Sequence, residues 1–254
     1  LDAVQRDYVQ GIAHSADILN ALIGDILDVS KIEARKLVLE HVPFDPHVLT
    51  HELCEILAPK ALDKGLELVC RVEPGVPRQI LADPLRVRQI LFNLLGNAIK
   101  FTERGEVGVR LSVSPPGGGV ERPHLLLEIT DTGIGIPKEK LGVLFERFRQ
   151  ADDSTTRRFG GTGLGTTIAR ERVLLMDGAI EVESAPGEGS CFRVRLPLLL
   201  DDVLPSPSPP EQRLRGLRVL VLESSATQRT WLMDSLERAG ARCPRTMEER
   251  GGGG

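Results

Sequence analysis

Segments with a helical period and segments with a strand period alternate across residues 43–200 of the chain. The pairs Asp45-Pro46 and Asp83-Pro84 each place an N-cap residue before a proline at the first helical position, which predicts two helix starts. Helices interleaved with mostly hairpin-linked strands predict an α+β fold, a two-layer α/β sandwich. The expected elements are a helix ending near residue 64, a strand at 66–72, a helix at 85–101, strands at 107–113 and 125–130, a helix at 163–176, and a closing hairpin of 179–184 with 190–196.

A long amphipathic helix is expected before this region, over residues 2–39, and Pro43 ends its pattern. Such a helix packs either on the core of its own domain or against a second copy in a helical bundle. The length of the stripe and the polarity of the opposite face favour the bundle at least as much. The residues of the stripe, at steps of three and four, are Ile12, Ala16, Leu19, Leu22, Ile23, Ile26 and Val29.

Residues 201–212 are rich in proline and serine, which is typical of a linker. After them, the apolar run at 217–222 predicts a strand buried on both faces, and a helix is expected at 227–239. One strand and one helix do not make a domain, so this third region is expected to be incomplete. The predicted divisions are a helix at 1–42, a folded domain at 43–200, a linker at 201–216 and a partial domain at 217–250.

Composition argues against several classes of protein. The chain has 254 residues, of which 41% are hydrophobic and 27% charged, and its net charge of −4 argues against a general nucleic-acid surface. No apolar run is long enough to span a membrane, and the N-terminal residues lack the layout of a signal peptide. The cysteines Cys54, Cys70, Cys191 and Cys243 are widely spaced without a CxxC pair, so we expect reduced structural thiols, and neither a disulfide framework nor a zinc site.

Three segments rich in glycine or amide side chains carry the candidate chemistry, at residues 93–102, 131–137 and 160–165. In the first, Asn93, Asn97 and Lys100 share one face of the expected helix. Amide oxygens are hard ligands for Mg²⁺ and an ammonium is a point charge for phosphate, so this face suits a magnesium–polyphosphate group. A solvated polar face is the alternative. Asparagine is a poor helix former, however, and two of them in mid-helix favour ligation.

The second and third segments suit a flat ligand that carries phosphates. Asp131 ends an apolar strand, and its carboxylate can accept a hydrogen bond from an exocyclic amine such as that of adenine. Gly133 and Gly135 let the backbone approach a ligand closely, with turn chemistry as the alternative reason for them. Residues 160–165 lead into a helix whose free amides can hold phosphate oxygens, and the polar stretch 150–159 before them is expected to be a mobile flap. No Lys-Ser/Thr pair follows and no buried strand precedes them, so neither a P-loop nor a dinucleotide fingerprint fits.

Together with Phe145-Glu146-Arg147-Phe148, these segments resemble the N, G1, F and G2 boxes of histidine kinase catalytic domains, in the same order and spacing. The resemblance covers about residues 19–197 and implies the Bergerat ATP-binding fold, which gyrase, Hsp90 and MutL ATPases share. It implies ATP as the substrate and Mg²⁺ as the cofactor. It implies that Asn93, Asn97 and Lys100 are catalytic, that Asn97 holds Mg²⁺ together with Asn93, and that Asp131 binds the adenine amine. The residues that it places around ATP are Asn97, Lys100, Phe101, Asp131, Gly133, Gly135, Ile136, Phe148, Gly161, Thr162, Gly163, Leu164, Gly165 and Ser190.

Residues 25–34 are similar to the second helix of the family's dimerisation and histidine-phosphotransfer hairpin. This similarity implies a homodimer through the N-terminal helix and a phosphoacceptor histidine on a helix that would precede Leu1. His14 lacks the acidic neighbour of that histidine, so we do not expect it to be phosphorylated.

Residues 218–223 are similar to the first strand of a receiver domain, which implies a hybrid kinase with a receiver domain or response regulator as partner. A receiver needs an acidic pair after this strand, and here Glu223 is followed by Ser224. Residues 165–169 are similar to sensors of diffusible quorum-sensing fatty acids. The resemblance as a whole implies the cytoplasmic portion of a bacterial sensor, membrane-anchored or not, without contacts of these residues to nucleic acid or membrane.

Three functions remain to be weighed. Hydrolysing ATPases of this superfamily carry a glutamate at the position of Asn93 to activate water, and a neutral amide cannot take that proton. Phosphoryl transfer depends on positioning and electrostatic stabilisation, which favours a kinase that transfers the ATP γ-phosphate to a histidine in a phosphorelay. A non-catalytic module that binds nucleotide or dimerises is the alternative, and a GHKL ATPase is favoured less.

Overall fold

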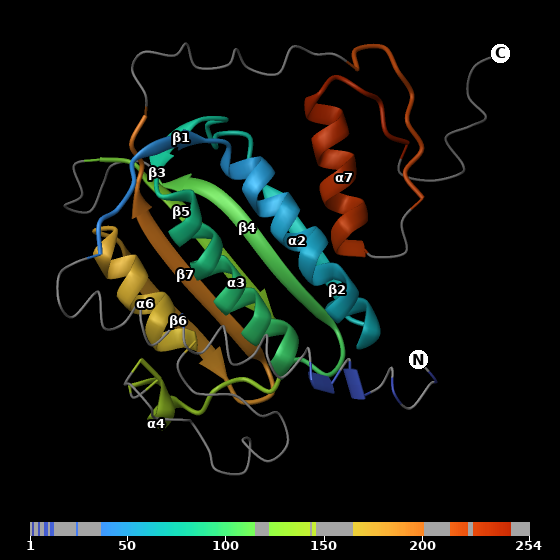
Figure 1. The fold of residues 1–254 in the computed structure, drawn as a ribbon. Helices are drawn as coiled ribbons and strands as arrows, with labels where there is room; N and C mark the ends of the chain where they lie inside the picture. Colours follow the sequence, from blue (N-terminus) through green and yellow to red (C-terminus); the bar gives the residue numbers. More distant parts are fainter. Residues whose placement is uncertain are drawn as a thin grey trace.

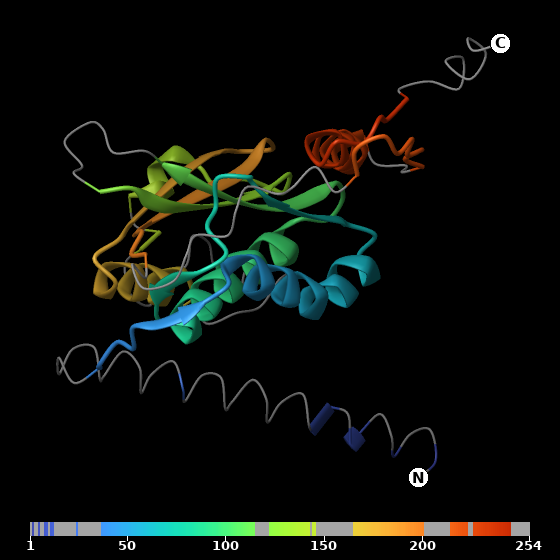
Figure 2. The same ribbon diagram turned by 90° about the horizontal axis from the view of Figure 1, so that it is seen from above.

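The computed structural model describes residues 37–114, 122–142, 144–145, 165–200, 214–222 and 226–244, together with residues 2, 5, 8, 9, 11, 12 and 24. Its centre has two layers, a five-stranded sheet and a set of helices that covers one face of the sheet (Figure 1). The view from above shows that these helices lie on the same side (Figure 2). This arrangement confirms the two-layer α/β sandwich.

The elements begin and end close to their predicted bounds. In chain order they are β1 (Val42–Phe44), α2 (Pro46–Asp63), β2 (Glu67–Val72), β3 (Ile80–Ala82), α3 (Pro84–Phe101), β4 (Glu106–Ser114), β5 (His124–Asp131), α4 (Lys138–Leu141), α6 (Gly165–Leu175), β6 (Ala179–Ala185), β7 (Gly189–Pro197) and α7 (Ala226–Arg238). Both Asp-Pro pairs start helices as predicted: Asp45 accepts a hydrogen bond from the backbone N of His47 (2.8 Å), and Asp83 accepts one from that of Arg86 (3.1 Å).

The sheet has the order β2-β4-β5-β7-β6. Strand β2 runs parallel to β4, and the remaining neighbours pair antiparallel. A parallel pair needs a crossover, which α3 provides between β2 and β4. The short strands β1 and β3 form a separate antiparallel pair that the sequence did not predict. Each of these strands has three residues, which is too short to show a recognisable alternation of apolar and polar side chains.

The core lies between the sheet and helices α2, α3 and α6. Alternate residues of the central strands point into it, so that Val109 on β4 and Leu127 on β5 are 1% and 0% exposed. Helix α3 runs through the middle of this layer and buries Ile90, Leu94 and Leu95 almost completely. The opposite face of α3 is thereby left for polar residues.

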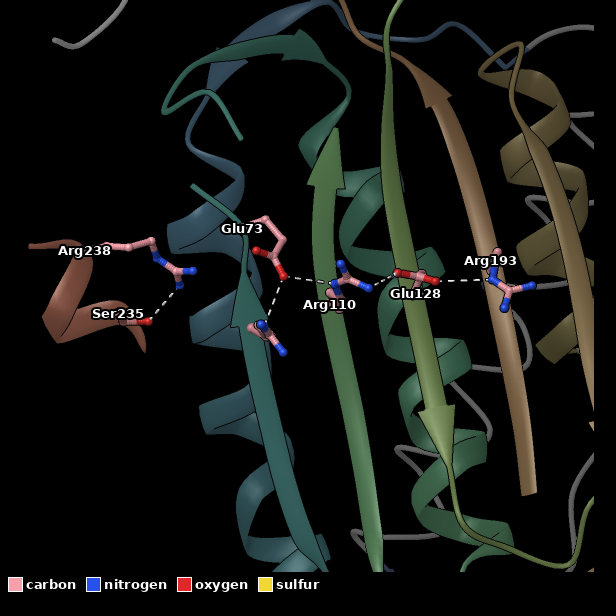
Figure 3. Close-up of polar contacts among 7 residues, drawn as sticks. Glu73, Arg110, Glu128, Arg193, Ser235 and Arg238 are labelled. Atoms are coloured by element: carbon pink, nitrogen blue, oxygen red, sulfur yellow. Dashed lines mark hydrogen bonds and ion pairs between the residues drawn. The ribbon is translucent and has the colours of Figure 1, made fainter. Parts of the chain in front are cut away.

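The outer face of the sheet carries a row of alternating charges that runs across its strands (Figure 3). Arg110 contacts Glu73 and Glu128 at 3.1 and 3.2 Å, and Arg193 contacts Glu128 at 3.2 Å. The side chains are partly exposed, so each pair contributes little stability by itself. The row explains why the strands alternate apolar and polar residues: this face is solvated.

The third region agrees only in part with its prediction. Helix α7 forms as expected and lies against β2 (Figure 3), where Val69 is buried on the outer side of the sheet. The buried strand predicted at 217–222 is wrong: a single bridge joins Arg218 to Arg242, and Leu222 is 82% exposed. Within the described part of the chain, no strand pairs along this segment, so its apolar side chains have no sheet to enter.

The predicted N-terminal helix falls almost wholly outside the described residues. Residues 37–41 are described and are not helical, so the predicted end at residue 39 is too late. Residues 201–213 of the predicted linker at 201–216 also lie outside them. No helix in the described part of the chain is long and apolar enough to cross a bilayer.

Candidate functional site

The polar face of α3 presents Asn93, Asn97 and Lys100, as their spacing predicted. All three are half-buried. The Asn93 amide donates a hydrogen bond to the carbonyl of Gly165 at 3.4 Å, and a side chain on Gly165 would come within 3.5 Å of the Asn97 amide nitrogen. The start of α6 therefore lies over this face. The first turn of α6 and the two asparagines meet in one place.

Two carboxamide oxygens at one place fit Mg²⁺ when phosphate oxygens supply other ligands, because both are hard donors. Among the described residues, no group of three His, Cys, Asp or Glu side chains could hold a metal ion. Asn93 and Asn97 would hold the magnesium, and the ion would neutralise phosphate charge.

The carboxyl end of α3 is capped by Lys64, a residue that the sequence did not single out. The Lys64 ammonium, just past the end of α2, donates hydrogen bonds to the carbonyls of Ile99 (2.8 Å), Lys100 (2.7 Å) and Thr102 (3.2 Å). An ammonium has three donors, and here all three are used. A cation at this position also opposes the negative end of the helix dipole. The sequence signals only a basic residue at a helix end, and nothing in it links Lys64 to α3.

The remaining carbonyl of this turn binds the loop that follows β5. The backbone N of Ile134 donates to the carbonyl of Phe101 at 3.3 Å. Lys64 and Ile134 thus hold the end of α3 from two sides. Lys100 lies at this end, with its Nζ 4.8 Å from the centre of the Phe101 ring.

The surroundings of Lys100 disfavour the charged form of its side chain. Burial lowers the pKa of its ammonium, and repulsion by the Lys64 ammonium lowers it further. An anion placed near Lys100 would relieve both effects. The electrostatics of this corner therefore favour a negatively charged ligand.

Asp131 stands at the end of β5, opposite Ser190 on β7. Its carboxylate accepts a hydrogen bond from the backbone N of Gly133 at 2.9 Å. Burial raises the pKa of the carboxyl, against hydrogen bonds from Gly133 and Ser190 that lower it. The carboxylate is thus fixed in orientation by the protein before any ligand arrives.

Glycines of the loop after β5 are required by packing inside the protein. Gly135 has a φ of +68°, and a side chain there would overlap the carbonyl of Ala185. A side chain on Gly133 would lie 2.5 Å from the carbonyl of Phe101. The close approach that these glycines permit is therefore to α3 and to the β6–β7 hairpin. Approach to a ligand is not needed to explain them.

A small hydrogen-bond cluster joins this loop to the closing hairpin. The backbone N of Ile136 donates to the Ser184 hydroxyl at 2.8 Å, and that hydroxyl lies 3.1 Å from the Ser190 hydroxyl. Through it, Ile136 and Ser190 are brought to the same corner as Asp131. Phe148, Gly161, Thr162, Gly163 and Leu164 lie outside the described residues, so their predicted roles stay predictions.

A cavity of about 620 Å³ lies elsewhere, at the start of β5 near His124. Strand β5 runs from His124 to Asp131, so the cavity and Asp131 are at opposite ends of the sheet. None of the predicted site residues lines it. The candidate site is the corner formed by the carboxyl end of α3, the loop after β5 and the start of α6.

Several known proteins are similar to the chain over these residues. Residues 82–200 match the family described as histidine kinase-, DNA gyrase B- and HSP90-like ATPase. The sensor histidine kinase GacS of Pseudomonas protegens is 44% identical over 93% of this chain and 25% of its own length, so the chain spans about a quarter of that relative. The crystal structure of full-length ShkA in complex with AMPPNP is 31% identical and superposes with a TM-score of 0.78, over 98% of this chain and 50% of ShkA. The mycobacterial sensor histidine kinase MprB is 30% identical, with a TM-score of 0.51, over 63% of this chain and 99% of the MprB chain.

Proposed function

Because the chain belongs to the sensor histidine kinase family, we propose that residues 43–200 bind Mg·ATP and transfer its γ-phosphate to a histidine in a phosphorelay. The observation that carries this proposal is the convergence of Asn93, Asn97 and Lys100 on α3 with Asp131 at the end of β5. Four polar groups of these types at one corner suit a nucleotide with its metal.

Each group has a task that its chemistry allows. Asp131 accepts a hydrogen bond from the adenine amine, and Lys100 binds the phosphates. Asn93 and Asn97 hold the magnesium that neutralises phosphate charge. Lys64 acts as a positioning residue, since it fixes the turn of α3 that carries Lys100 without reaching the ligand itself.

Kinase chemistry is favoured over hydrolysis by Asn93. A neutral amide cannot accept a proton from water, and in the structure it donates a hydrogen bond to Gly165. The corner offers positioning and electrostatic stabilisation, which phosphoryl transfer needs most.

The wider assembly is proposed from the sequence and the family. The apolar stripe of the N-terminal helix forms the homodimer, and a receiver domain or response regulator takes the phosphoryl group onward. The net charge of −4 supports a protein that does not bind nucleic acid. We place these residues in the cytoplasmic portion of a bacterial sensor, where ATP is present.

The test is nucleotide binding by Asp131→Asn. The amide turns an acceptor at adenine into a donor, and a lost hydrogen bond to a charged group costs about 1.5–3 kcal/mol, so we expect Mg·ADP to bind at least about tenfold more weakly. Isothermal calorimetry on the full chain measures this. Asp177→Asn is the matched control, because it makes the same chemical change at an exposed site past the far end of α6. Equal affinities of Asp131→Asn and wild type would remove Asp131 from the site.

A further inference from the structure

Two cysteines that are far apart in sequence meet in the core between α2 and the sheet. Cys54 lies on α2 and is 8% exposed, while Cys70 lies on β2 and is half-buried against the same core. Strand β2 is at the edge of the sheet, which leaves Cys70 partly open to solvent. In the sequence the four thiols are widely spaced and no two of them form a recognisable pair.

The fold brings Cys54 and Cys70 close together because a single turn joins α2 to β2. Gly65, with a φ of +67°, forms that turn between α2 and β2. Cys54 precedes it by 11 residues (65 − 54), or about 16 Å at the rise of an α-helix. Cys70 follows it by 5 residues (70 − 65), also about 16 Å at the rise of a strand. Both residues face the core between the packed elements α2 and β2, so their thiols are neighbours.

The contact makes the two thiols chemically unequal. The neighbouring Cys54 thiol lowers the pKa of Cys70, although burial opposes this, and the nearby charge of His51 lowers it further. The neighbouring Cys70 thiol and burial raise the pKa of Cys54. A thiolate is the reactive form of cysteine, and Cys70 is also the more accessible of the two. Cys70 is therefore suited to react first, and Cys54 to react second.

We propose that Cys54 and Cys70 form a reversible disulfide that links α2 to the edge strand β2, by exchange with a low-molecular-weight disulfide. The Cys70 thiolate attacks one sulfur of the reagent, breaks its S–S bond and releases one thiolate. Cys54 then loses its proton and attacks the Cys70 sulfur of the mixed disulfide. The new S–S bond closes and the second thiolate leaves. The cysteine pair loses two electrons, and one reagent disulfide becomes two thiols.

The cross-link would act on the element that holds the candidate site. Cys54 lies within α2, and this helix ends at its C-cap residue Lys64. Lys64 in turn caps the carboxyl end of α3, which carries part of the candidate site. A disulfide would fix α2 to the sheet. The proposal does not depend on the proposed function, because it concerns only the two thiols.

The experiment exposes the folded full chain to oxidised glutathione and maps the cysteine peptides by mass spectrometry without reduction. We expect a peptide that joins Cys54 to Cys70, its disappearance after dithiothreitol, and a loss of two of the four free thiols. The cross-link should also raise the Tm by about 5 °C or more, since it restricts the unfolded chain. Free Cys54 and Cys70 after this treatment would overturn the proposal.

Three variants test the order of the two steps. Cys54→Ala removes the second thiol, so glutathione should stay attached to Cys70. Cys70→Ala removes the first, and the buried Cys54 should remain unmodified. Cys191→Ala is the control, because Cys191 lies on β7 away from the pair, and the link should form as in wild type. A link that forms only in denaturant, or glutathione on Cys54 in Cys70→Ala, would contradict the proposed roles.

Discussion

At the scale of one residue, the proposed role of Asp131 predicts that nucleotide binding depends on pH. Burial raises the pKa of its carboxyl above the ordinary value of 3.8. Only the ionised form offers both oxygens as acceptors, so binding should weaken as the pH falls through this raised pKa, earlier than for an ordinary aspartate. Adenosine is the probe of choice, because it has no phosphate that titrates in the same range. Calorimetry between about pH 7 and about pH 4 measures the effect, and a dependence that is unchanged in Asp131→Asn would assign it to another group.

The raised pKa of the Asp131 carboxyl also determines how the free energy of unfolding changes with pH. A raised pKa in the folded state means that the folded protein holds the proton more tightly than the unfolded chain. The free energy of unfolding therefore falls as the pH rises from 3.8 through the raised pKa. Asp131→Asn removes this loss, so we expect the variant to be at least as stable as wild type at neutral pH. Weaker nucleotide binding in that variant would then not be a consequence of unfolding.

Lys64 offers a second test at the residue scale. Lys64→Met removes the charge and three hydrogen bonds from the end of α3 while keeping most of the side-chain length. The stem of Lys64 is exposed, so the cost to stability should be modest, about 1 kcal/mol. Affinity for Mg·ADP should fall about fivefold, but affinity for adenosine by less than about twofold, because the lost charge lies at the phosphate end.

Lys60→Met is the matched control for this variant, since Lys60 is an exposed lysine one turn earlier on α2. It should leave both affinities unchanged. If Lys64→Met weakened adenosine as much as Mg·ADP, its role would be general to the fold. Calorimetry with the two ligands separates these outcomes.

At the scale of elements, the N-cap of α3 also ties down the chain that leads into the domain. Asp83 is 5% exposed, caps α3 through Arg86, and accepts a hydrogen bond from the backbone N of Glu40 at 3.3 Å. Asp83→Ala should therefore cost about 1–2 kcal/mol of unfolding free energy, the upper range for a lost cap. Urea denaturation measures it. Asp63→Ala, at the exposed carboxyl end of α2, should change stability by less than about 0.5 kcal/mol.

The elements also show what sequence could and could not predict. Asp-Pro pairs and alternating strands are local signals, and α2, α3, β4 and β5 follow them closely. The parallel pairing of β2 with β4, the hydrogen bonds of Lys64 and the meeting of Cys54 with Cys70 depend on chain turns between distant residues. Such contacts leave no period and no motif. The apolar run at 217–222 is the opposite case: the local strand signal is present, but no strand among the described residues pairs along it.

At the scale of the whole molecule, the apolar stripe of the N-terminal helix is expected to drive dimerisation. Leu22→Glu places a charge in the middle of that stripe, so the variant should sediment as a monomer at concentrations where wild type is a dimer. Leu62→Glu is the control, because Leu62 on α2 is already 76% exposed. Two monomers at high micromolar concentration would show that the stripe packs within its own chain.

The charges on the outer face of the sheet have a consequence for aggregation. Among the strands that the structure describes, β6 is an edge of the sheet, the kind of surface on which a second sheet can grow. Its Glu181 and Glu183 are exposed and pair with Arg195 and Arg193 of the adjacent strand. If two copies joined edge to edge around Val182, Glu181 of one would stand opposite Glu183 of the other, and like charges directly opposite oppose pairing. These charges thus oppose the fusion of sheets from two copies into a continuous, insoluble ribbon.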